Sequence, residues 1–461
     1  MAYNFKECNR EQVYLLPPAL QAWLPPTDLV WLVIDAVEEM DLKAFYLKYR
    51  EDGKGQAAFE PSMIVALLLY AYSLGIRSSR AIEQLCERDI GFRVIAANQA
   101  PDHTTISRFR KDNGVALEDL FNQVLKLCKE AGLVKVGVVA LDGSKVKANA
   151  ALEANRTYEH IEGEVKKMLA EAAIKDAEED RRYGPDQRGD ELPDELADRT
   201  RRKTRLAACK KQLEEKAAQE AAQQQLKIDE RQAEEAETGI KKRGRKPQEP
   251  DPTPAAEAKA NPTDPDSRIM KTRSGYVQGY NGQAVVTEEQ IILAAEVTNQ
   301  ENDVNQLHPM VQKAQENITA IAPNETQMIK TVLADAGYAS DKNLAAIAPD
   351  GPEYLVATKK GWKQRKETAE APPPRGRIPK ALTLRQRMER KLLTQRGRKL
   401  YKKRGQTVEP VFGQIKDCRG IRHFMRRGLD ACAQEWKFIC ATHNLLKLWR
   451  SGKGIAAQVA T

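Results

Sequence analysis

The sequence lacks the features that place a chain in a membrane or in an oxidising compartment. Its longest apolar run, Met63 to Leu74, is shorter than the roughly 20 residues that span a bilayer. No apolar stretch follows the charged residues near the N-terminus, so we expect no secretory signal. The seven cysteines are scattered without a Cys-x-x-Cys pair, which argues against a disulfide or zinc framework and predicts reduced thiols in the cytoplasm.

Histidine is also scarce, and no histidine pairs with a serine or cysteine in a recognisable catalytic pattern. The five histidines are dispersed along the chain, and we interpret them as ordinary polar residues. The sequence therefore does not predict catalysis by an activated side-chain nucleophile.

Charge is plentiful but unevenly distributed. Residues 361–427 hold 21 Lys and Arg against 5 Asp and Glu, a local charge of +16, and the net charge of +9 leaves −7 for the rest of the chain. A solvated loop or a disordered tail explains such a segment taken alone. Because it leads into an apolar helix pattern and contains a candidate catalytic carboxylate, it also suits a surface that binds a phosphate backbone.

Residues 1–130 are predicted to form an N-terminal all-α domain. Within it, the segment PDHTTISRFRKDN (101–113) has Asp102 in the position of a helix N-cap. The segment resembles the second half of a helix-turn-helix, in which Arg108 and Arg110 would contact DNA. An ordinary polar surface helix is an equal alternative on the sequence alone.

A long polar stretch interrupts the strand patterns that follow. VKVGVVAL (134–141) is a strand pattern, and residues 276–286 and 291–298 predict a hairpin. Between them, residues 153–249 are rich in Ala, Glu, Lys and Gln and lack the apolar seam of a coiled coil. We interpret this stretch as a solvated helical hairpin that the core fold does not need.

The rest of the chain completes an α/β pattern. Short strands are predicted around 331–335 and 354–358, and helices over 303–321, 408–416 and 430–449. We therefore predict an α/β domain made of residues 131–152 and 270–450, with residues 153–269 as an inserted helical hairpin and a basic, Pro-rich linker.

Two aspartates follow predicted strands at points where a turn is expected. Asp142 and Asp335 each end an apolar strand and precede a glycine. Asp-Gly and Asp-x-Gly sequences are common in turns, so each aspartate alone has an ordinary structural explanation. If the strands are adjacent, the two carboxylates repel unless they share a proton or a metal ion. Oxygen ligands of this kind suit Mg²⁺ or Mn²⁺.

A third carboxylate lies in the basic segment. In RKLYKKRGQTVEPVFGQIK (398–416), Glu409 stands at the start of a predicted helix and Lys416 follows two turns later on the same face. A glutamate beside Pro410 is also a routine first-turn acid. One carboxylate for metal and one cation for phosphate nevertheless make a workable surface for phosphoryl transfer.

These motifs resemble the DDE transposases of bacterial insertion sequences. The strand before Asp142, the ADAGY strand and the Tyr-Arg-Glu-Lys pattern around Glu409 carry the resemblance, with GYVQGYNGQAVV (275–286) and PDHTTISRFR beside them. The resemblance runs from about residue 55 to 449 and excludes most of the insertion. The family's signature has three residues between Arg and Glu, whereas four separate Arg404 from Glu409, so Lys402 or Lys403 is an alternative to Arg404.

The resemblance implies an RNase-H-like mixed sheet flanked by helices and a site of Asp142, Asp335 and Glu409 that holds two divalent ions, Mg²⁺ or Mn²⁺. It also implies that Tyr401, Arg404 and Lys416 hold double-stranded transposon-end DNA, that residues 1–130 bind DNA ends, and that the active complex is a homodimer. No protein nucleophile is required. The expected reaction is metal-dependent cleavage and strand transfer on DNA.

Further observations bear on DNA binding and on the alternatives. The run KKRGRKP (241–247) resembles an AT-hook, in which Arg243 and Arg245 lie along a narrow minor groove, although such short basic runs are frequent by chance. One alternative is an RNase-H-like nuclease without strand transfer. Another is a non-catalytic DNA-binding regulator, although such a protein has no need to bury three carboxylates in a basic domain.

Overall fold

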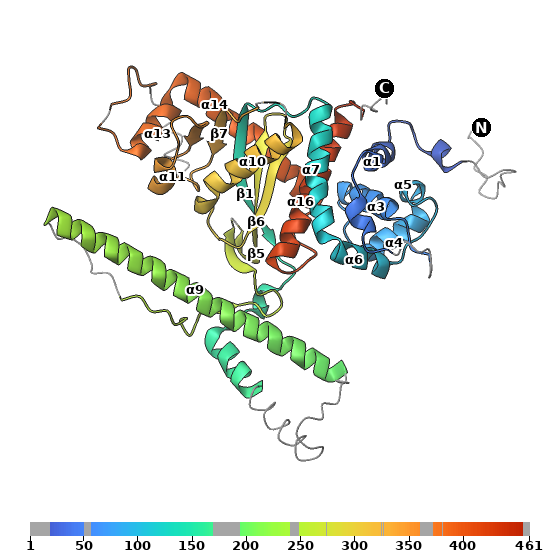
Figure 1. Ribbon diagram of the computed structural model, residues 1–461, viewed down its shortest axis with the longest axis horizontal. Helices are drawn as coiled ribbons and strands as arrows, with labels where there is room; N and C mark the ends of the chain where they lie inside the picture. The colour runs from blue at the N-terminus through green and yellow to red at the C-terminus, as the bar shows by residue number, and fades with distance from the viewer. Residues whose placement is uncertain are drawn as a thin grey trace, which may run out of the picture.

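The computed structural model describes residues 19–49, 57–168, 194–239, 249–272, 274–323, 325, 327–359, 372–379 and 381–454. A mixed sheet lies at the centre of the molecule (Figure 1). N-terminal helices flank one side of it, basic C-terminal helices lie at the other side, and a long helix projects away from the body. The predicted class, α/β with an N-terminal helical region, is confirmed.

The N-terminal region is helical throughout its described parts. Its elements are η1 (Leu20–Trp23), α1 (Leu29–Glu38), α2 (Lys43–Tyr46), α3 (Pro61–Ser73), α4 (Ser79–Arg88), α5 (Ile90–Ile95), α6 (His103–Asp112) and α7 (Gly114–Glu130). Pro61 occupies the first turn of α3, whose residues are buried almost without exception. The Asp102 side chain caps α6 by accepting from the backbone N–H groups of Thr104 and Thr105, as predicted.

The central sheet combines antiparallel and parallel pairing. Its strands are β1 (Val138–Lys147), β4 (Arg268–Thr272), β5 (Gly275–Thr287), β6 (Ile292–Thr298), β7 (Thr331–Ala334) and β8 (Glu353–Val356). Their order is β4-β5-β1-β7-β8, and β6 also pairs with β5. β1, β5 and β6 are antiparallel neighbours, whereas β7 and β8 run parallel to β1. The predicted hairpin of β5 and β6 is confirmed.

One strand differs from its predicted length. β1 does not end at Asp142 but continues to Lys147, because residues 143–147 stay paired with residues 279–283 of β5. Only its parallel pairing with β7 stops early, at Leu141 and Ala334. Asp142 is therefore an interior residue of β1 that lies where the pairing with β7 ends.

Two helices join the sheet to the N-terminal helices. α10 (Leu307–Ile321), preceded by the 3-10 turn η3 (Val304–Gln306), packs on β6, and α16 (Leu429–Arg450) packs on both β6 and α7 (Figure 1). A buried ion pair fixes the contact: Arg77 Nη1 lies 3.2 Å from Glu435 Oε1 on α16. A single apolar core therefore runs from the N-terminal helices through the sheet.

The polar stretch forms a projecting unit with a small core of its own. α9 (Asp194–Thr238) is a long helix that leaves the body (Figure 1), and residues 158–168 form a second helix. Near them are the short turn η2 (Leu152–Ala154) and the two-stranded pair of β2 (Arg156–Thr157) and β3 (Lys259–Ala260). A small cluster, separate from the main core, consists of Ile161, Val165, Leu206, Cys209, Leu213 and Ala260.

The described part of the basic segment is folded. It contains α13 (Leu384–Leu393), α14 (Gln395–Thr407), α15 (Glu409–Gly413) and a π-helical turn, Gln414–Cys418, and the short α11 (Asp341–Ala345) packs beside α13. Thr383 and Gln386 form a reciprocal capping box at the start of α13. The solvated-loop interpretation is therefore wrong for residues 383–418. Across the described ranges, no helix is both long and apolar enough to cross a membrane.

Candidate active site

Asp142 and Asp335 follow paired residues of neighbouring strands, Asp142 within β1 and Asp335 directly after the end of β7. Each aspartate directly follows the last residue of its strand that pairs in the parallel register of β1 and β7. Asp142 Oδ1 accepts a hydrogen bond from the Gly143 N–H at 2.9 Å, and Asp335 Oδ1 accepts one from the Gly337 N–H at 2.7 Å. Two carboxylates that are far apart in the sequence thus lie at the same end of the parallel pairing between β1 and β7.

The Asp142 carboxylate is in an unfavourable place for a negative charge. Its side chain is 18% exposed. Burial raises the pKa of Asp142 to about 6; Arg404 opposes this shift, and the charges of Asp335 and Asp303 add to it. The ionised form of Asp142 is therefore stabilised by a nearby cation.

α14 supplies that cation. Arg404 Nη2 donates to Asp142 Oδ2 at 2.7 Å, and the Arg404 side chain is 13% exposed. One turn earlier, Tyr401 Oη donates to the backbone oxygen of Ala334 at 3.3 Å, directly before Asp335. The Tyr401 and Arg404 side chains thus contact both strands that carry the aspartates.

Glu409 is connected to this pair of aspartates through Arg404. It begins α15, its side chain is 64% exposed, and its Oε1 lies 3.3 Å from Arg404 Nη1. Arg404 therefore bridges Asp142 and Glu409. Within the described ranges, no group of three His, Cys, Asp or Glu side chains is gathered closely enough to hold a metal ion.

Lys416 lies on the π-helical turn and contacts β1 just beyond Asp142. Its Nζ donates to Ser144 Oγ at 2.5 Å and to the backbone oxygen of Lys145 at 2.6 Å. Burial lowers the pKa of Lys416 to about 8. In this structure the Lys416 ammonium group fixes the turn after α15 against β1.

A further acidic residue of the site, Asp303, is not predicted from the sequence. It follows β6 and stands just before η3, with a side chain that is 22% exposed. Asp303 Oδ1 accepts from Asn281 Nδ2 at 2.6 Å and from Gln283 Nε2 at 2.8 Å, and it lies 3.6 Å from Lys145 Nζ. No local motif distinguishes Asp303, because its partners lie on β1 and β5.

The remaining predicted DNA contacts are differently placed. Arg108 is exposed on α6, whereas Arg110 donates to Tyr72 Oη at 3.2 Å and to the backbone oxygen of Arg77 at 2.7 Å, and also contacts Ser79 Oγ. Arg110 is therefore engaged within the N-terminal domain. Arg243 and Arg245 lie outside the described residues, and their minor-groove contact stays a prediction.

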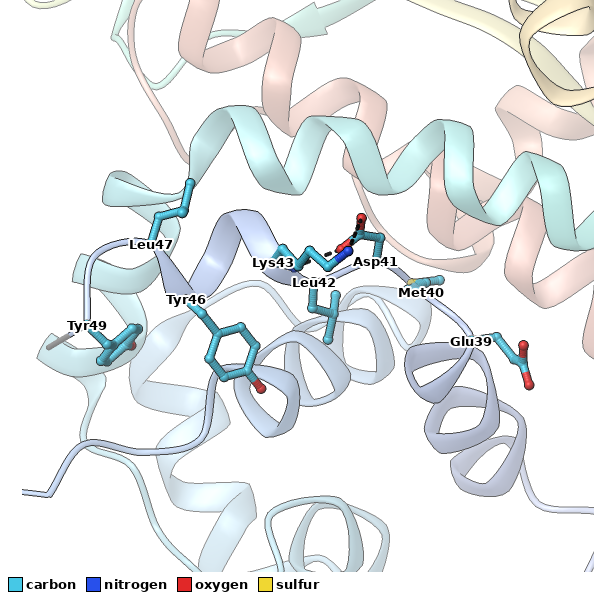
Figure 2. Close-up of a pocket in the computed structure, with 8 residues that line it drawn as sticks. All are labelled: Glu39, Met40, Asp41, Leu42, Lys43, Tyr46, Leu47 and Tyr49. Atoms are coloured by element: carbon cyan, nitrogen blue, oxygen red, sulfur yellow. Dashed lines mark hydrogen bonds and ion pairs between the residues drawn. The ribbon is translucent and has the colours of Figure 1, made fainter. Parts of the chain in front are cut away.

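A pocket of about 920 Å³ lies elsewhere, on the N-terminal helices between the end of α1 and the residues after α2 (Figure 2). Tyr46, Leu47 and Tyr49 line it together with an exposed ion pair between Lys43 Nζ and Asp41 Oδ2 at 3.9 Å. None of the candidate site residues contributes to this pocket, so it does not define the active site.

Two family models match the chain. Residues 18–112 match a family described as a transposase domain (DUF772), and residues 237–445 match the transposase DDE domain. The second match includes Asp335 and Glu409, while Asp142 precedes it and is connected to Asp335 by the register of β1 and β7. No curated protein and no solved structure matches the chain significantly.

Proposed function

Since the chain belongs to the DDE transposases of insertion-sequence type, we propose that it cuts DNA at insertion-sequence ends and joins these ends to target DNA. One observation carries this proposal: Asp142 and Asp335 lie where the parallel pairing of β1 and β7 ends, and Arg404 contacts both Asp142 and Glu409. DNA is the macromolecular partner, and a homodimer is the proposed active unit.

The strand order supports an RNase-H-like assignment for the catalytic domain. β1, β5 and β6 are antiparallel neighbours in the sheet; β7 then adds in parallel on the other edge of β1, and β8 adds in parallel to β7. This arrangement brings the end of β7 beside the middle of β1. The two aspartates of the proposed site come from these two strands.

The donor atoms suit the divalent ions that this family uses. Asp142, Asp335 and Glu409 offer only carboxylate oxygens, the preferred ligands of Mg²⁺ and Mn²⁺. Burial opposes ionisation of the Asp142 carboxylate, and a bound divalent ion would offset this effect with its positive charge, as Arg404 does in this structure. We propose that these three residues hold two ions, which when bound supply activation of the attacking oxygen and stabilisation of the leaving oxygen.

The residues of the chain itself have distinct proposed roles. Tyr401 and Arg404 hold α14 against the two strands, and Lys416 holds the turn that follows Glu409. Lys399 and Lys402, exposed one turn apart on α14, are the proposed contacts of this helix with DNA phosphates. Arg108 on α6 is the proposed DNA contact of the N-terminal domain.

The test is a cleavage and joining assay on a duplex that carries the inverted repeat flanking this gene. Asp142→Asn, Asp335→Asn and Glu409→Gln should each remove cleavage, because an amide is a much poorer Mg²⁺ ligand than a carboxylate. Asp417→Asn is the matched control, since Asp417 is an exposed carboxylate of the same helical region and pairs with Arg422. DNA affinity should stay equal or rise in all four variants, because each loses negative charge.

The products distinguish the alternatives. Cut ends that appear in joined molecules support the transposase, whereas cut ends that never join support a nuclease without strand transfer. Wild-type protein that binds the duplex but leaves it intact in Mg²⁺ and Mn²⁺ supports the non-catalytic regulator. Carboxylate variants that still cut contradict the assigned site.

A further inference from the structure

Asp303 contacts two neighbouring strands of the sheet, β1 and β5, near the proposed site. Its Oδ1 accepts from Asn281 and Gln283, both on β5, and faces Lys145 on β1. Asn281 and Gln283 are completely buried, and the sheet register pairs them with Lys145 and Gly143. The two amide donors are therefore fixed by the sheet, and they fix the Asp303 carboxylate in turn.

The Asp303 carboxylate lies beside two glycines, and at Gly143 an added side chain would clash with it. A Cβ atom at position 143 would come within 2.5 Å of Asp303 Oδ1. A Cβ atom at position 337 would come within 3.4 Å of Asp303 Oδ2 and 2.9 Å of Asp335 Oδ1. Asp303 therefore lies between the residue after Asp142 and the turn that carries Asp335.

A hydrogen-bonded chain leads from Asp303 to that turn. Gln283 donates to Asp303 through Nε2, and its Oε1 accepts from the hydroxyl group of Tyr338. Tyr338 is fully buried, three residues after Asp335, and its N–H donates to the backbone oxygen of Asp335 at 3.3 Å. The position of Tyr338 therefore sets where the turn begins, and with it the position of the Asp335 carboxylate.

We propose that Asp303 is a positioning residue of the metal site, which holds the Asp335 turn in register with Asp142 through Gln283 and Tyr338. The proposal rests on the proposed function, because it takes Asp335 as a metal ligand. Partners that orient metal ligands typically change metal affinity or activity by 10- to 100-fold when they are removed. The role assigned to Asp303 is to orient, and it does not require Asp303 to touch an ion.

Two substitutions at Asp303 separate positioning from direct ligation. Asp303→Ala removes the acceptor of the hydrogen bonds from the Asn281 and Gln283 side-chain amides. Mn²⁺ affinity measured by calorimetry should therefore fall roughly 10- to 100-fold, and the half-saturating Mg²⁺ concentration for cleavage should rise by a similar factor. Asp303→Asn keeps an acceptor oxygen of the same shape, so it should restore Mn²⁺ affinity to within about threefold of wild type. Affinity for end DNA should be unchanged in both variants.

Asp264 provides a matched control. It is also a buried carboxylate that accepts from a tyrosine of the sheet, Tyr280 Oη at 2.7 Å, but its other partner is the Gly428 N–H and not the site. Asp264→Ala should lower the melting temperature at unchanged Mn²⁺ affinity. Tyr338→Phe should weaken Mn²⁺ binding, and its effect should not add to that of Asp303→Ala because both break one chain of bonds.

The outcomes that overturn the proposal are distinct. Unchanged Mn²⁺ affinity in Asp303→Ala makes Asp303 merely structural. Loss of affinity in Asp303→Asn as severe as in Asp335→Asn makes Asp303 a ligand rather than a positioning residue. If wild type binds Mn²⁺ at this site but never cuts DNA, the proposed function fails, while the calorimetric comparison still decides the role of Asp303.

Discussion

Arg404 and Asp142, which lie 262 positions apart in the sequence, form an ion pair in which Nη2 of the guanidinium is 2.7 Å from Oδ2 of the carboxylate. The same guanidinium reaches Glu409, so one side-chain cation contacts two of the three proposed metal ligands. A divalent ion needs the same carboxylate oxygens. Metal binding and the Arg404 contacts are therefore expected to compete.

Removal of the guanidinium tests this competition. Arg404→Gln should bind Mn²⁺ roughly tenfold more tightly without DNA, which corresponds to about 1.4 kcal/mol of lost competition. The comparison belongs near pH 8, where Asp142 with its pKa of about 6 is ionised in the wild type. Calorimetry is the measurement. Unchanged or weaker binding by Arg404→Gln would mean that the guanidinium supports the ligands rather than competing for them.

The exposed face of α14 should account for part of the salt dependence of DNA binding. Lys399→Gln combined with Lys402→Gln should reduce the slope of log affinity against log salt by about 1.8, or about 0.9 for each lost phosphate contact. The control is the double variant Lys126→Gln and Lys313→Gln, which removes the same charge from α7 and α10. Salt-titrated anisotropy measures the slopes. Equal slopes in both double variants would rule out α14 as the DNA path.

The projecting unit should be removable without loss of the main fold. Thr157 and Lys259 are paired residues of β2 and β3, so an Asn-Gly turn that replaces residues 158–258 should close a two-residue hairpin. This change removes the separate core of the unit except for Ala260, and the melting temperature of the body should stay within about 4 °C of wild type. Insoluble protein or a large fall in melting temperature would show that α9 stabilises the sheet.

His443 should make the fold sensitive to acid. It is buried on α16, and burial lowers its pKa to about 3. Below pH 6.5 the unfolded chain binds a proton that the folded chain does not, so stability falls with pH until the folded pKa is reached. At pH 5 this effect amounts to about 2 kcal/mol.

The measurement is urea unfolding at pH 7.5 and pH 5. His443→Gln should lose less stability between the two values than wild type, by about the same 2 kcal/mol, because glutamine does not titrate. The comparison of two proteins cancels other groups, including Asp142, whose raised pKa acts in the opposite direction. Identical losses in both proteins would contradict the assigned effect of His443.

Local patterns in the sequence predicted much of the fold. The hairpin of β5 and β6, the short strand β7 and the final helix were visible as apolar periodicity. In the basic segment the sequence predicts the helix that begins near Glu409 but not α13 and α14, although Thr383 and Gln386 have the spacing of a capping box. Composition concealed them, because a run of lysine and arginine suits a solvated loop as well as a helix.

Long-range contacts account for what the sequence did not reveal at the site. Asp142-Gly143 is typical of a turn, yet β1 continues through it, and Gly143 instead leaves room for the Asp303 carboxylate. Asp303 itself follows a strand and precedes a helix, as many aspartates do. Its partners are set by the pairing of β1 with β5, and that pairing is not apparent from residue spacing.

Asp335→Cys tests whether Asp335 binds a divalent metal ion during DNA cleavage. A thiolate is a softer ligand than a carboxylate and suits Mg²⁺ poorly, whereas Mn²⁺ accepts it better. The measurement is the ratio of cleavage rates in Mn²⁺ and Mg²⁺ for wild type and variant, with Asp417→Cys as control. Asp335→Cys should lose cleavage in Mg²⁺ and recover part of it in Mn²⁺, while Asp417→Cys should behave like wild type. If Asp335→Cys cuts DNA in Mg²⁺ at the wild-type rate, Asp335 is not a metal ligand.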